Sequence, residues 1–281
     1  MGVVLEVFGH RGACGYLPEN TMESFELAFE LGCSAIEFDV VLTKDLVTVI
    51  RHDRDFSITT DIASRNLASV MVDDLELAEL SQVRATERYP DSRAESALQN
   101  GKYSIPTLRE VLTNPKFDGK HLIVELKYGK HYKEAGIDMI GAVKQEIEKS
   151  NAEQRGLKLT IEAFEFSVLR EAKKRIGDLA KYVFLSAPDM LPEEYDELTD
   201  DLLDEIAENF DGLSVHYSMI LKSDLVERTK QRGLSMFTYT ARTETAEGEV
   251  RAWFERLAST GVDGIFCDQP DLMIDVVRSL A

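Results

Sequence analysis

Short apolar runs alternate with amphipathic stretches along the whole sequence. Apolar runs of about four to eight residues are typical of buried strands, and apolar residues three or four positions apart are typical of helices. Eight strands separated by helices in 281 residues predict an α/β fold, a (β/α)8 TIM barrel. The predicted strands are Val3–Phe8, Ala35–Leu42, Leu122–Leu126, Leu157–Ala163, Lys181–Ser186, Gly212–His216, Leu234–Thr240 and Val262–Cys267. The predicted helices include Thr21–Leu31, Tyr132–Lys149, Ser167–Ile176, Thr199–Asn209, Lys222–Gln231, Thr243–Ser259 and Asp271–Leu280.

The turn after the first strand distinguishes this barrel from an open, doubly wound sheet. A sheet of that kind that binds a dinucleotide carries the pattern G-x-G-x-x-G after its first strand. The segment Gly9–Asn20, which reads GHRGACGYLPEN, does not have this form. The barrel is therefore the favoured fold.

One segment departs from the alternation of strands and helices. We predict one barrel domain over residues 1–281, with an insertion at about residues 54–106 after the second strand. Within the insertion we expect a short helix over Val72–Val83, capped by Asp73 or Asp74, and a loop over Arg84–Lys102. Because barrel enzymes bind substrates at the C-terminal ends of their strands, we expect the insertion over that face. A peripheral position is the alternative.

Composition narrows the range of partners. Lys and Arg number 32 and Asp and Glu number 51, so the net charge is −19. This charge argues against nucleic acid or an anionic membrane as a partner, and a small anionic substrate would need local cations or a metal. No stretch approaches the ~20 apolar residues of a membrane span, and the start lacks the pattern of a signal peptide. We expect a cytoplasmic protein with three free cysteines; the oligomeric state is left open.

Three carboxylates lie in strands that are otherwise apolar. Glu37 and Asp39 are two positions apart in the second strand, so their side chains leave the same face, and Glu125 lies in the next barrel strand. Burial of several carboxylates is unfavourable unless their charge is compensated. A divalent cation is one compensation, and an all-oxygen site favours Mg²⁺ or Ca²⁺ over zinc. A buried ion-pair network with Arg11 and Lys127 is the alternative.

Two histidines are expected at the same edge of the barrel. His10 follows the first strand, and a return strand over Leu46–Arg51 brings His52 back toward it. Two histidines beside a metal suit in-line phosphoryl transfer, in which one takes a proton from the attacking oxygen and the other protonates the leaving oxygen. Arg11, Lys127 and the metal would stabilise the charge on the non-bridging oxygens.

The order of these motifs resembles that of the glycerophosphodiester phosphodiesterase family. The family's marks are His-Arg-Gly, Pro-Glu-Asn-Thr, Glu-x-Asp, His-Asp, Pro-Thr-Leu-x-Glu, Glu-x-Lys and a closing strand. They correspond here to residues 10–12, 18–21, 37–39, 52–53, 106–110, 125–127 and 261–270. Two positions differ from the family's usual residues, because Thr240 stands where Asn is common and Cys267 where Thr is common. These changes bear on the shape and polarity of the pocket.

The resemblance implies a barrel with an insertion after the second strand and metal-dependent hydrolysis of glycerophosphodiesters to glycerol 3-phosphate and an alcohol. It also implies attack by the neighbouring hydroxyl of the glycerol, which gives a cyclic phosphate that water then opens. Which histidine is base and which is acid does not follow from the spacing. The implied roles are an acid–base pair of His10 and His52, ligands of Mg²⁺ or Ca²⁺ from Glu37, Asp39 and Glu125, and phosphate contacts from Arg11 and Lys127.

Two further residues are candidates for substrate binding. Glu19 follows Pro18 in the Pro-Glu-Asn-Thr motif, and His216 ends the sixth predicted strand. Asn20 with Glu23 fits a capping box, so we expect it to begin a helix. The alternative functions are a lysophospholipase D-type phosphodiesterase and a barrel that binds phosphodiesters without turnover.

Overall fold

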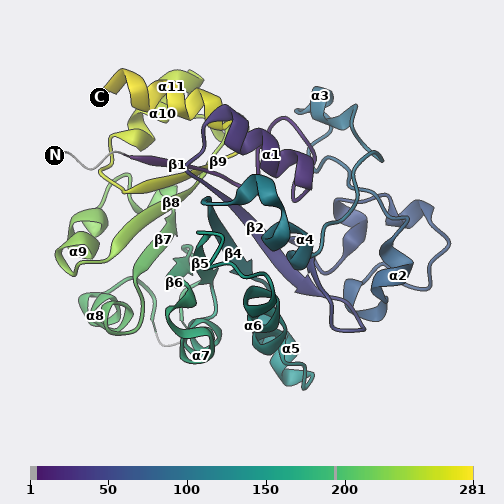
Figure 1. Cartoon of the computed structure of the whole chain (residues 1–281). Coiled ribbons are helices and arrows are strands. Elements are labelled where there is room, and N and C mark those ends of the chain that lie inside the picture. The colour runs from purple at the N-terminus through teal and green to yellow at the C-terminus, as the bar shows by residue number, and fades with distance from the viewer. Residues whose placement is uncertain (1–4, 193–194, 281) are drawn as a thin grey trace.

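The computed structural model describes residues 5–192 and 195–280, so Val3 and Val4 of the first predicted strand lie outside the described residues. Within the described residues, eight parallel strands form a closed barrel with helices around it (Figure 1). Each barrel strand pairs with the barrel strand that follows it in the chain, and β1 pairs with both β2 and β9, which closes the barrel. The predicted (β/α)8 barrel is confirmed. Its strands are β1 (Glu6–Gly9), β2 (Ala35–Leu42), β4 (His121–Leu126), β5 (Lys158–Ala163), β6 (Lys181–Ser186), β7 (Gly212–His216), β8 (Ser235–Ala241) and β9 (Gly264–Cys267).

The helices that surround the barrel largely follow the apolar periodicity of the sequence. The predicted helix over Tyr132–Lys149 is wrong in one respect: it is divided in two at Gly136, whose φ of 73° lies in the left-handed region. The predicted helix over Thr243–Ser259 begins only at Val250, after a 3₁₀ turn over Thr243–Thr245. The helices are α1 (Met22–Leu31), α5 (Gly129–Glu134), α6 (Met139–Lys149), α7 (Phe166–Ile176), α8 (Asp200–Asn209), α9 (Leu225–Gln231), α10 (Val250–Ala258) and α11 (Pro270–Leu280).

Apolar side chains close the barrel at the N-terminal ends of its strands. Phe8, Phe237 and Phe266 meet edge to face, and the centroid of the Phe8 ring lies 5.1 Å from those of the other two rings. A Cβ at Gly264 would lie 2.4 Å from the Phe8 ring, which explains the glycine at this position. These rings form a floor, so polar groups that point into the barrel gather at its other end.

The insertion lies between β3 (Thr48–Ile50) and β4. The predicted return strand is confirmed, because β3 pairs antiparallel with β2 and brings the chain back along it. The segment that follows has a small apolar core, which packs against the β2–β3 hairpin. This core includes Val41, Val49, Phe56, Ile62, Val72, Leu75, Leu80, Val83 and Ala85.

Within the insertion, the structure corrects two predictions. The helix expected over Val72–Val83 is interrupted, because Leu75 has extended backbone angles and Glu76 starts the separate helix α2 (Leu77–Leu80) with its own capping box. The loop expected over Arg84–Lys102 contains the short helix α3 (Ala94–Ala97). The chain returns to the barrel through α4 (Leu108–Thr113).

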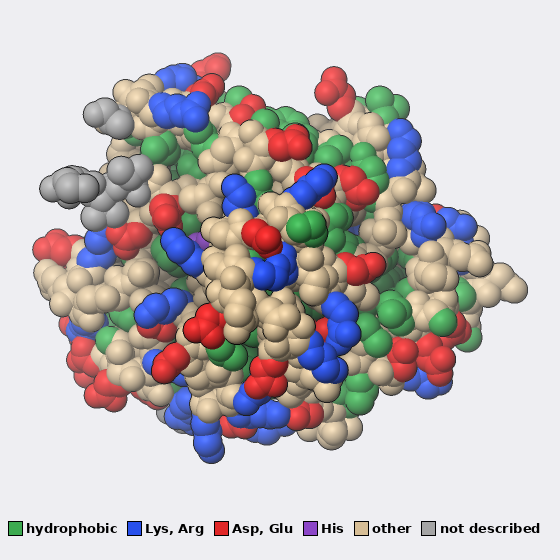
Figure 2. All heavy atoms as spheres, in the orientation of Figure 1, with side chains coloured by type: hydrophobic (Ala, Val, Ile, Leu, Met, Phe, Trp, Pro, Cys, Tyr) green, Lys and Arg blue, Asp and Glu red, His purple; other side chains and the backbone are tan. Residues whose placement is uncertain are grey.

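Acidic and basic side chains are interspersed over the face of the molecule shown in Figure 2. On this face the acidic side chains do not gather in one patch. Among the helices of residues 5–192 and 195–280, none combines the length and the apolar character needed to cross a membrane.

Candidate active site

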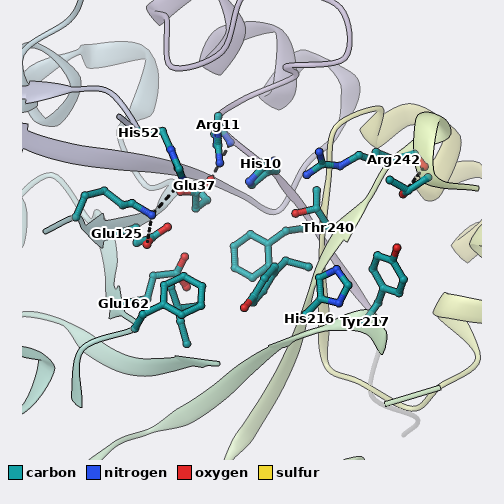
Figure 3. Close-up of a pocket in the computed structure, with 16 residues that line it drawn as sticks. His10, Arg11, Glu37, His52, Glu125, Glu162, His216, Tyr217, Thr240 and Arg242 are labelled. Atoms are coloured by element: carbon teal, nitrogen blue, oxygen red, sulfur yellow. Dashed lines mark hydrogen bonds and ion pairs between the residues drawn. The ribbon is translucent and has the colours of Figure 1, made fainter. Parts of the chain in front are cut away.

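A pocket of about 300 Å³ opens at the C-terminal ends of the strands (Figure 3). His10 follows β1, Lys127 follows β4 and His216 ends β7, so residues far apart in sequence meet here. Eight of the nine residues proposed from the sequence lie in this pocket as its lining or as the third carboxylate of its cluster: His10, Arg11, Glu37, Asp39, His52, Glu125, Lys127 and His216. The ninth, Glu19, lines a smaller cavity next to it.

The three predicted carboxylates form one buried cluster. Asp39 of β2 and Glu125 of β4 are register partners, and one oxygen from each of Glu37, Asp39 and Glu125 lies within 4.8 Å of the others. Glu37 Oε1 and Asp39 Oδ1 have no hydrogen-bond partner among the described residues. Buried carboxylate oxygens without a donor are unfavourable, and an oxygen-binding cation supplies what they lack. The cluster therefore fits Mg²⁺ or Ca²⁺.

Burial and mutual repulsion shift the pKa values within this cluster. Burial, followed by the negative charge of Asp39, raises the pKa of Glu37 well above its usual range. Burial also raises the pKa of Glu125 to about 7, although Lys127 opposes the shift. Burial alone would raise the pKa of Asp39, but the charges of Arg11, His52 and Lys127 together outweigh burial and lower that pKa. The cationic groups of the protein thus compensate the negative charge of Asp39 better than those of Glu37 and Glu125.

A left-handed turn directs Arg11 toward the carboxylates. Arg11 has φ 51° and Gly12 has φ 84°, and a Cβ at Gly12 would lie about 2.5 Å from Ser24. The turn lets the backbone N–H of Arg11 donate to Glu37 Oε2 at 2.8 Å, and the Arg11 guanidinium donates to Glu19 Oε1 at 2.9 Å. Glu19 is thus placed as a partner of Arg11.

Asn20 does not cap a helix, so that prediction is wrong. The N-cap of α1 is Thr21, whose Oγ1 accepts a hydrogen bond from the backbone N–H of Ser24. Asn20 is in the left-handed region, with φ 58°, and its Nδ2 donates to Asp39 Oδ2 at 2.8 Å. The Asn20 amide therefore forms a hydrogen bond with the buried carboxylate of Asp39 instead of capping the helix.

His10 and His52 are each oriented by a carboxylate on the Nδ1 atom. His10 Nδ1 lies 2.7 Å from Asp268 Oδ1, and His52 Nδ1 lies 2.9 Å from Asp53 Oδ1. Although burial opposes these shifts, the contact with His52 lowers the pKa of Asp53 to about 2 and the contact with His10 lowers that of Asp268 further. Because an ionised carboxylate only accepts hydrogen bonds, Nδ1 carries a proton in both rings, which leaves Nε2 for other partners.

Burial also determines the charge of the two rings. Burial and then the charge of Arg11 lower the pKa of His10 to about 4, against the opposing effect of Asp268. The pKa of His52 is lowered by the same two causes in the same order. Both rings are neutral at pH 7. Lys127 Nζ lies 3.1 Å from His52 Nε2 and donates to Glu125 Oε1 at 2.8 Å, so it links the histidine to the carboxylate cluster (Figure 3).

The opposite side of the pocket is aromatic. His216 stacks on Tyr217 with ring centroids 4.2 Å apart, and its Nδ1 lies 2.7 Å from Ser218 Oγ. Tyr239 and Phe164 continue this side, with centroids 6.0 Å apart. Of the two positions that differ from the family's usual residues, Thr240 lines the pocket, whereas Cys267 is buried and donates to the carbonyl of Gln269.

The sequence interpretation missed several residues of the site. Glu162 of β5 is 3% exposed, lines the pocket and has an Oε2 atom without a hydrogen-bond partner among the described residues. Burial and then the charge of Glu125, its register partner, raise its pKa. A single carboxylate near the end of an apolar strand is the signal that could have found it. Asp268 directly follows the last strand, and Arg242 follows β8.

A family model described as the glycerophosphoryl diester phosphodiesterase family matches residues 10–272. The chain belongs to this family. The resemblance seen in the sequence, and with it the prediction of a phosphodiesterase, is confirmed.

Relatives and solved structures of this phosphodiesterase family match almost the whole chain. It is 27% identical over 277 residues to a glycerophosphodiester phosphodiesterase of Caldanaerobacter subterraneus, with 97% of each chain covered. It is 29% identical over 272 residues to one of Bacillus subtilis, with 96% of this chain and 85% of that one covered. A solved structure from Silicibacter pomeroyi has a TM-score of 0.82 at 25% identity and covers 100% and 95% of the two chains.

A second solved structure supports the fold. It is an Oleispira antarctica phosphodiesterase in complex with its product sn-glycerol-3-phosphate, with a TM-score of 0.75 at 23% identity and coverage of 98% and 97%. At this identity the likeness is one of architecture, and it agrees with the closed barrel of this family.

Proposed function

We propose that this chain hydrolyses glycerophosphodiesters to glycerol 3-phosphate and an alcohol, with a divalent cation as cofactor. The observation that carries the proposal is the meeting of two neutral, carboxylate-oriented histidines and three buried carboxylates in one pocket. The family match supports the class of substrate. The three free, buried cysteines support a cytoplasmic location.

The cation would be held by Glu37, Asp39 and Glu125. Two of these carboxylates offer oxygens that lack other partners, and the set contains only oxygen ligands, which favours Mg²⁺ or Ca²⁺. When bound, the cation supplies positive charge to the phosphate and to the oxygens around it.

The two histidines would move the protons. A neutral ring with a free Nε2 can take a proton from the glycerol hydroxyl next to the phosphate, while the other ring, once protonated, gives one to the leaving alcohol oxygen. Attack by the substrate's own hydroxyl benefits from proximity and gives a cyclic phosphate that water opens. Arg11 and Lys127 would hold the non-bridging oxygens.

The remaining two candidates take different parts in this proposal. His216 would contact the substrate from the aromatic side, where Tyr217 and Tyr239 offer apolar surface to carbon atoms. Glu19, bound to Arg11 and to Arg88, would act through the guanidinium of Arg11 rather than on the substrate.

The test is the release of glycerol 3-phosphate from a panel of glycerophosphodiesters after chelation, with Mg²⁺, Ca²⁺ or neither added back. We expect release that depends on the cation, with a ranking among the alcohols. Release from lysophospholipids alone would replace the proposed substrate class. Cation-dependent binding of glycerophosphodiesters without any product would show a binding protein instead of an enzyme.

A further inference from the structure

We propose that Arg88 and Arg93 of the insertion are positioning residues, each of which holds one of the two histidines through an aspartate. The proposal rests on the proposed function, in which His10 and His52 carry the protons. It assigns to the insertion a part in the chemistry that is separate from covering the pocket.

The first chain of contacts leads from Arg93 to His10. Arg93 Nη2 donates to Asp268 Oδ2 at 2.5 Å, and the other oxygen of Asp268 accepts from His10 Nδ1 at 2.7 Å. The side chains of Arg93 and Asp268 are 3% and 2% exposed. Arg93 also donates to the carbonyl of Cys14 at 2.9 Å and to Glu244 Oε1 at 2.5 Å, so its guanidinium is fixed on several sides.

The second chain of contacts leads from Arg88 to His52 and has the same form. Arg88 Nη2 donates to Asp53 Oδ2 at 2.5 Å, and the other oxygen of Asp53 accepts from His52 Nδ1 at 2.9 Å. Arg88 is held in place by two further hydrogen bonds to Glu19, at 2.7 and 2.8 Å. Both chains line one cavity beside the main pocket, with His10, His52, Arg88, Arg93 and Asp268 in its wall.

The shared geometry has a definite chemical effect. Each aspartate gives one oxygen to an arginine and the other to a histidine, so the arginine fixes both the orientation and the ionised state of the carboxylate. An ionised, fixed carboxylate holds the imidazole with its proton on Nδ1, so that Nε2 is the nitrogen that can accept a proton. In His52 this nitrogen lies 3.1 Å from Lys127 Nζ. Both arginines come from the insertion, so the barrel alone would lack this support.

The arginines also moderate the charge that the histidines experience. His10 faces Arg11, Arg242 and Asp268, with Cys14 Sγ 4.0 Å from its Nδ1, and Arg242 Nε lies 3.6 Å from Asp268 Oδ2. Loss of Arg93 leaves Arg242 as the weaker partner, so the negative charge of Asp268 acts more strongly on His10. His52 faces Arg11, Lys127, Asp39 and Asp53, and loss of Arg88 has the same effect through Asp53.

The experiment uses Arg93→Gln and Arg88→Gln in the full chain, with Arg93→Lys as the conservative variant. The matched control is Arg54→Gln, because Arg54 also pairs with an aspartate of the insertion, Asp73, at 2.5 Å. That pair lies outside both cavities that contain the histidines. The variants are compared in kcat, KM and pH profile, with glycerophosphocholine as the substrate and Mg²⁺ at a saturating concentration. Their thermal unfolding is compared at the same Mg²⁺ concentration. The NMR signals of the histidine Nδ1 protons are recorded in the metal-free protein.

We expect Arg93→Gln and Arg88→Gln to lose about 10- to 100-fold in kcat with KM changed less than about threefold. The acid limb of the pH profile should move to higher pH, and the Nδ1 proton signal of the corresponding histidine should broaden or shift. Arg93→Lys should regain part of kcat, and Arg54→Gln should keep kcat within about twofold even where it lowers the unfolding temperature.

Three results would overturn the proposal. If the glutamine variants fold and keep kcat and the pH profile unchanged, the two arginines only hold the insertion in place and do not position the histidines. An equal loss in Arg54→Gln would assign the effect to the insertion's stability, and an unchanged Nδ1 proton signal in both glutamine variants would remove the link to the histidines. Absence of activity in the wild-type chain would instead count against the proposed function, while the NMR comparison would still decide on the arginine–aspartate–histidine contacts.

Discussion

The two sides of the pocket are built on different principles. On the side formed by β1, β2 and β4, charged side chains and histidines contact one another, as with Lys127 between His52 and Glu125. On the side formed by β5, β7 and β8, aromatic rings dominate, and the hydroxyl of Tyr239 is used by the backbone carbonyl of Ser186. Glu162 is the carboxylate that the aromatic side contributes.

This difference separates two tasks. Charges held in fixed positions can stabilise a transition state without reorganisation, so the charged side is suited to the reaction itself. Aromatic rings offer apolar contact area and shape but few directional polar contacts. The aromatic side is therefore suited to selecting which alcohol group of the substrate fits and how its glycerol is oriented. Changes on the charged side should therefore act on kcat or on the cation, and changes on the aromatic side should act on KM.

The largest effect is expected from His52→Ala. Removal of the ring takes away one member of the proposed acid–base pair, so kcat should fall by about two to four orders of magnitude. The carboxylate cluster is untouched, so titration with Mn²⁺ should show cation binding close to that of the wild type. Wild-type turnover by this variant would remove His52 from the mechanism.

A smaller and conditional loss is expected from Glu37→Gln. The amide removes one negative ligand oxygen while keeping the shape of the side chain, so the cation should bind more weakly. Activity at low Mg²⁺ should fall at least about tenfold and recover substantially in excess cation. A loss that no concentration of Mg²⁺ or Ca²⁺ restores would argue against a ligand role for Glu37.

Removal of the metal should make the stability of the protein depend on pH through the buried carboxylates of the pocket. The pKa of Glu125 is about 7 in the folded protein and near 4.5 in the unfolded chain, and burial also raises those of Glu37 and Glu162. At these carboxylates the folded state binds more protons than the unfolded chain, so their contribution to stability falls as the pH rises, for Glu125 from about 4.5 through about 7. The slope is ~1.4 kcal/mol per pH unit for each extra proton held.

The measurement that checks this expectation is urea unfolding in a chelator at several pH values above 6.5. In that range His10, whose pKa is lowered to about 4, no longer contributes a slope of opposite sign. Stability should fall as the pH rises through about 7 in the chelator and stay level with saturating Mg²⁺. Glu162→Gln should reduce the slope in the chelator, and an identical slope would show that Glu162 does not hold an extra proton.

The sequence predicted the charged side well because its residues carry local signals. Glu37 and Asp39 interrupt an apolar strand, so a short pattern shows that their side chains leave the same face of that strand. His10 follows a strand directly, so a short pattern also places it at the C-terminal edge of the barrel. The barrel itself was predictable for the same reason, since its strands are apolar runs between helices.

Other features depend on contacts that short patterns do not contain. Asp268 lies 258 positions from its partner His10, and Arg93 lies 175 positions from Asp268, so nothing local links them. Asn20 is a residue type that often caps helices, but its side-chain amide donates a hydrogen bond to the buried carboxylate of Asp39. Leu75 fits a helical pattern but is extended in the insertion. In each case tertiary contacts outweigh local preference.

The smallest effect is expected on the aromatic side, from Tyr217→Leu. The ring of Tyr217 stacks on His216 and meets Trp253 edge to face, with centroids 5.2 Å apart. Tyr217 also lines the pocket, and a substrate group packed on its ring would gain about 0.5–1.5 kcal/mol, so KM should change about two- to tenfold while kcat stays within about threefold. Tyr217→Phe keeps the ring and serves as the matched control, with both constants close to the wild type. The ranking of alcohols should change with Leu and not with Phe; a fall in kcat as large as that of His52→Ala would erase the division between the two sides, because the aromatic side would then take part in the chemical step.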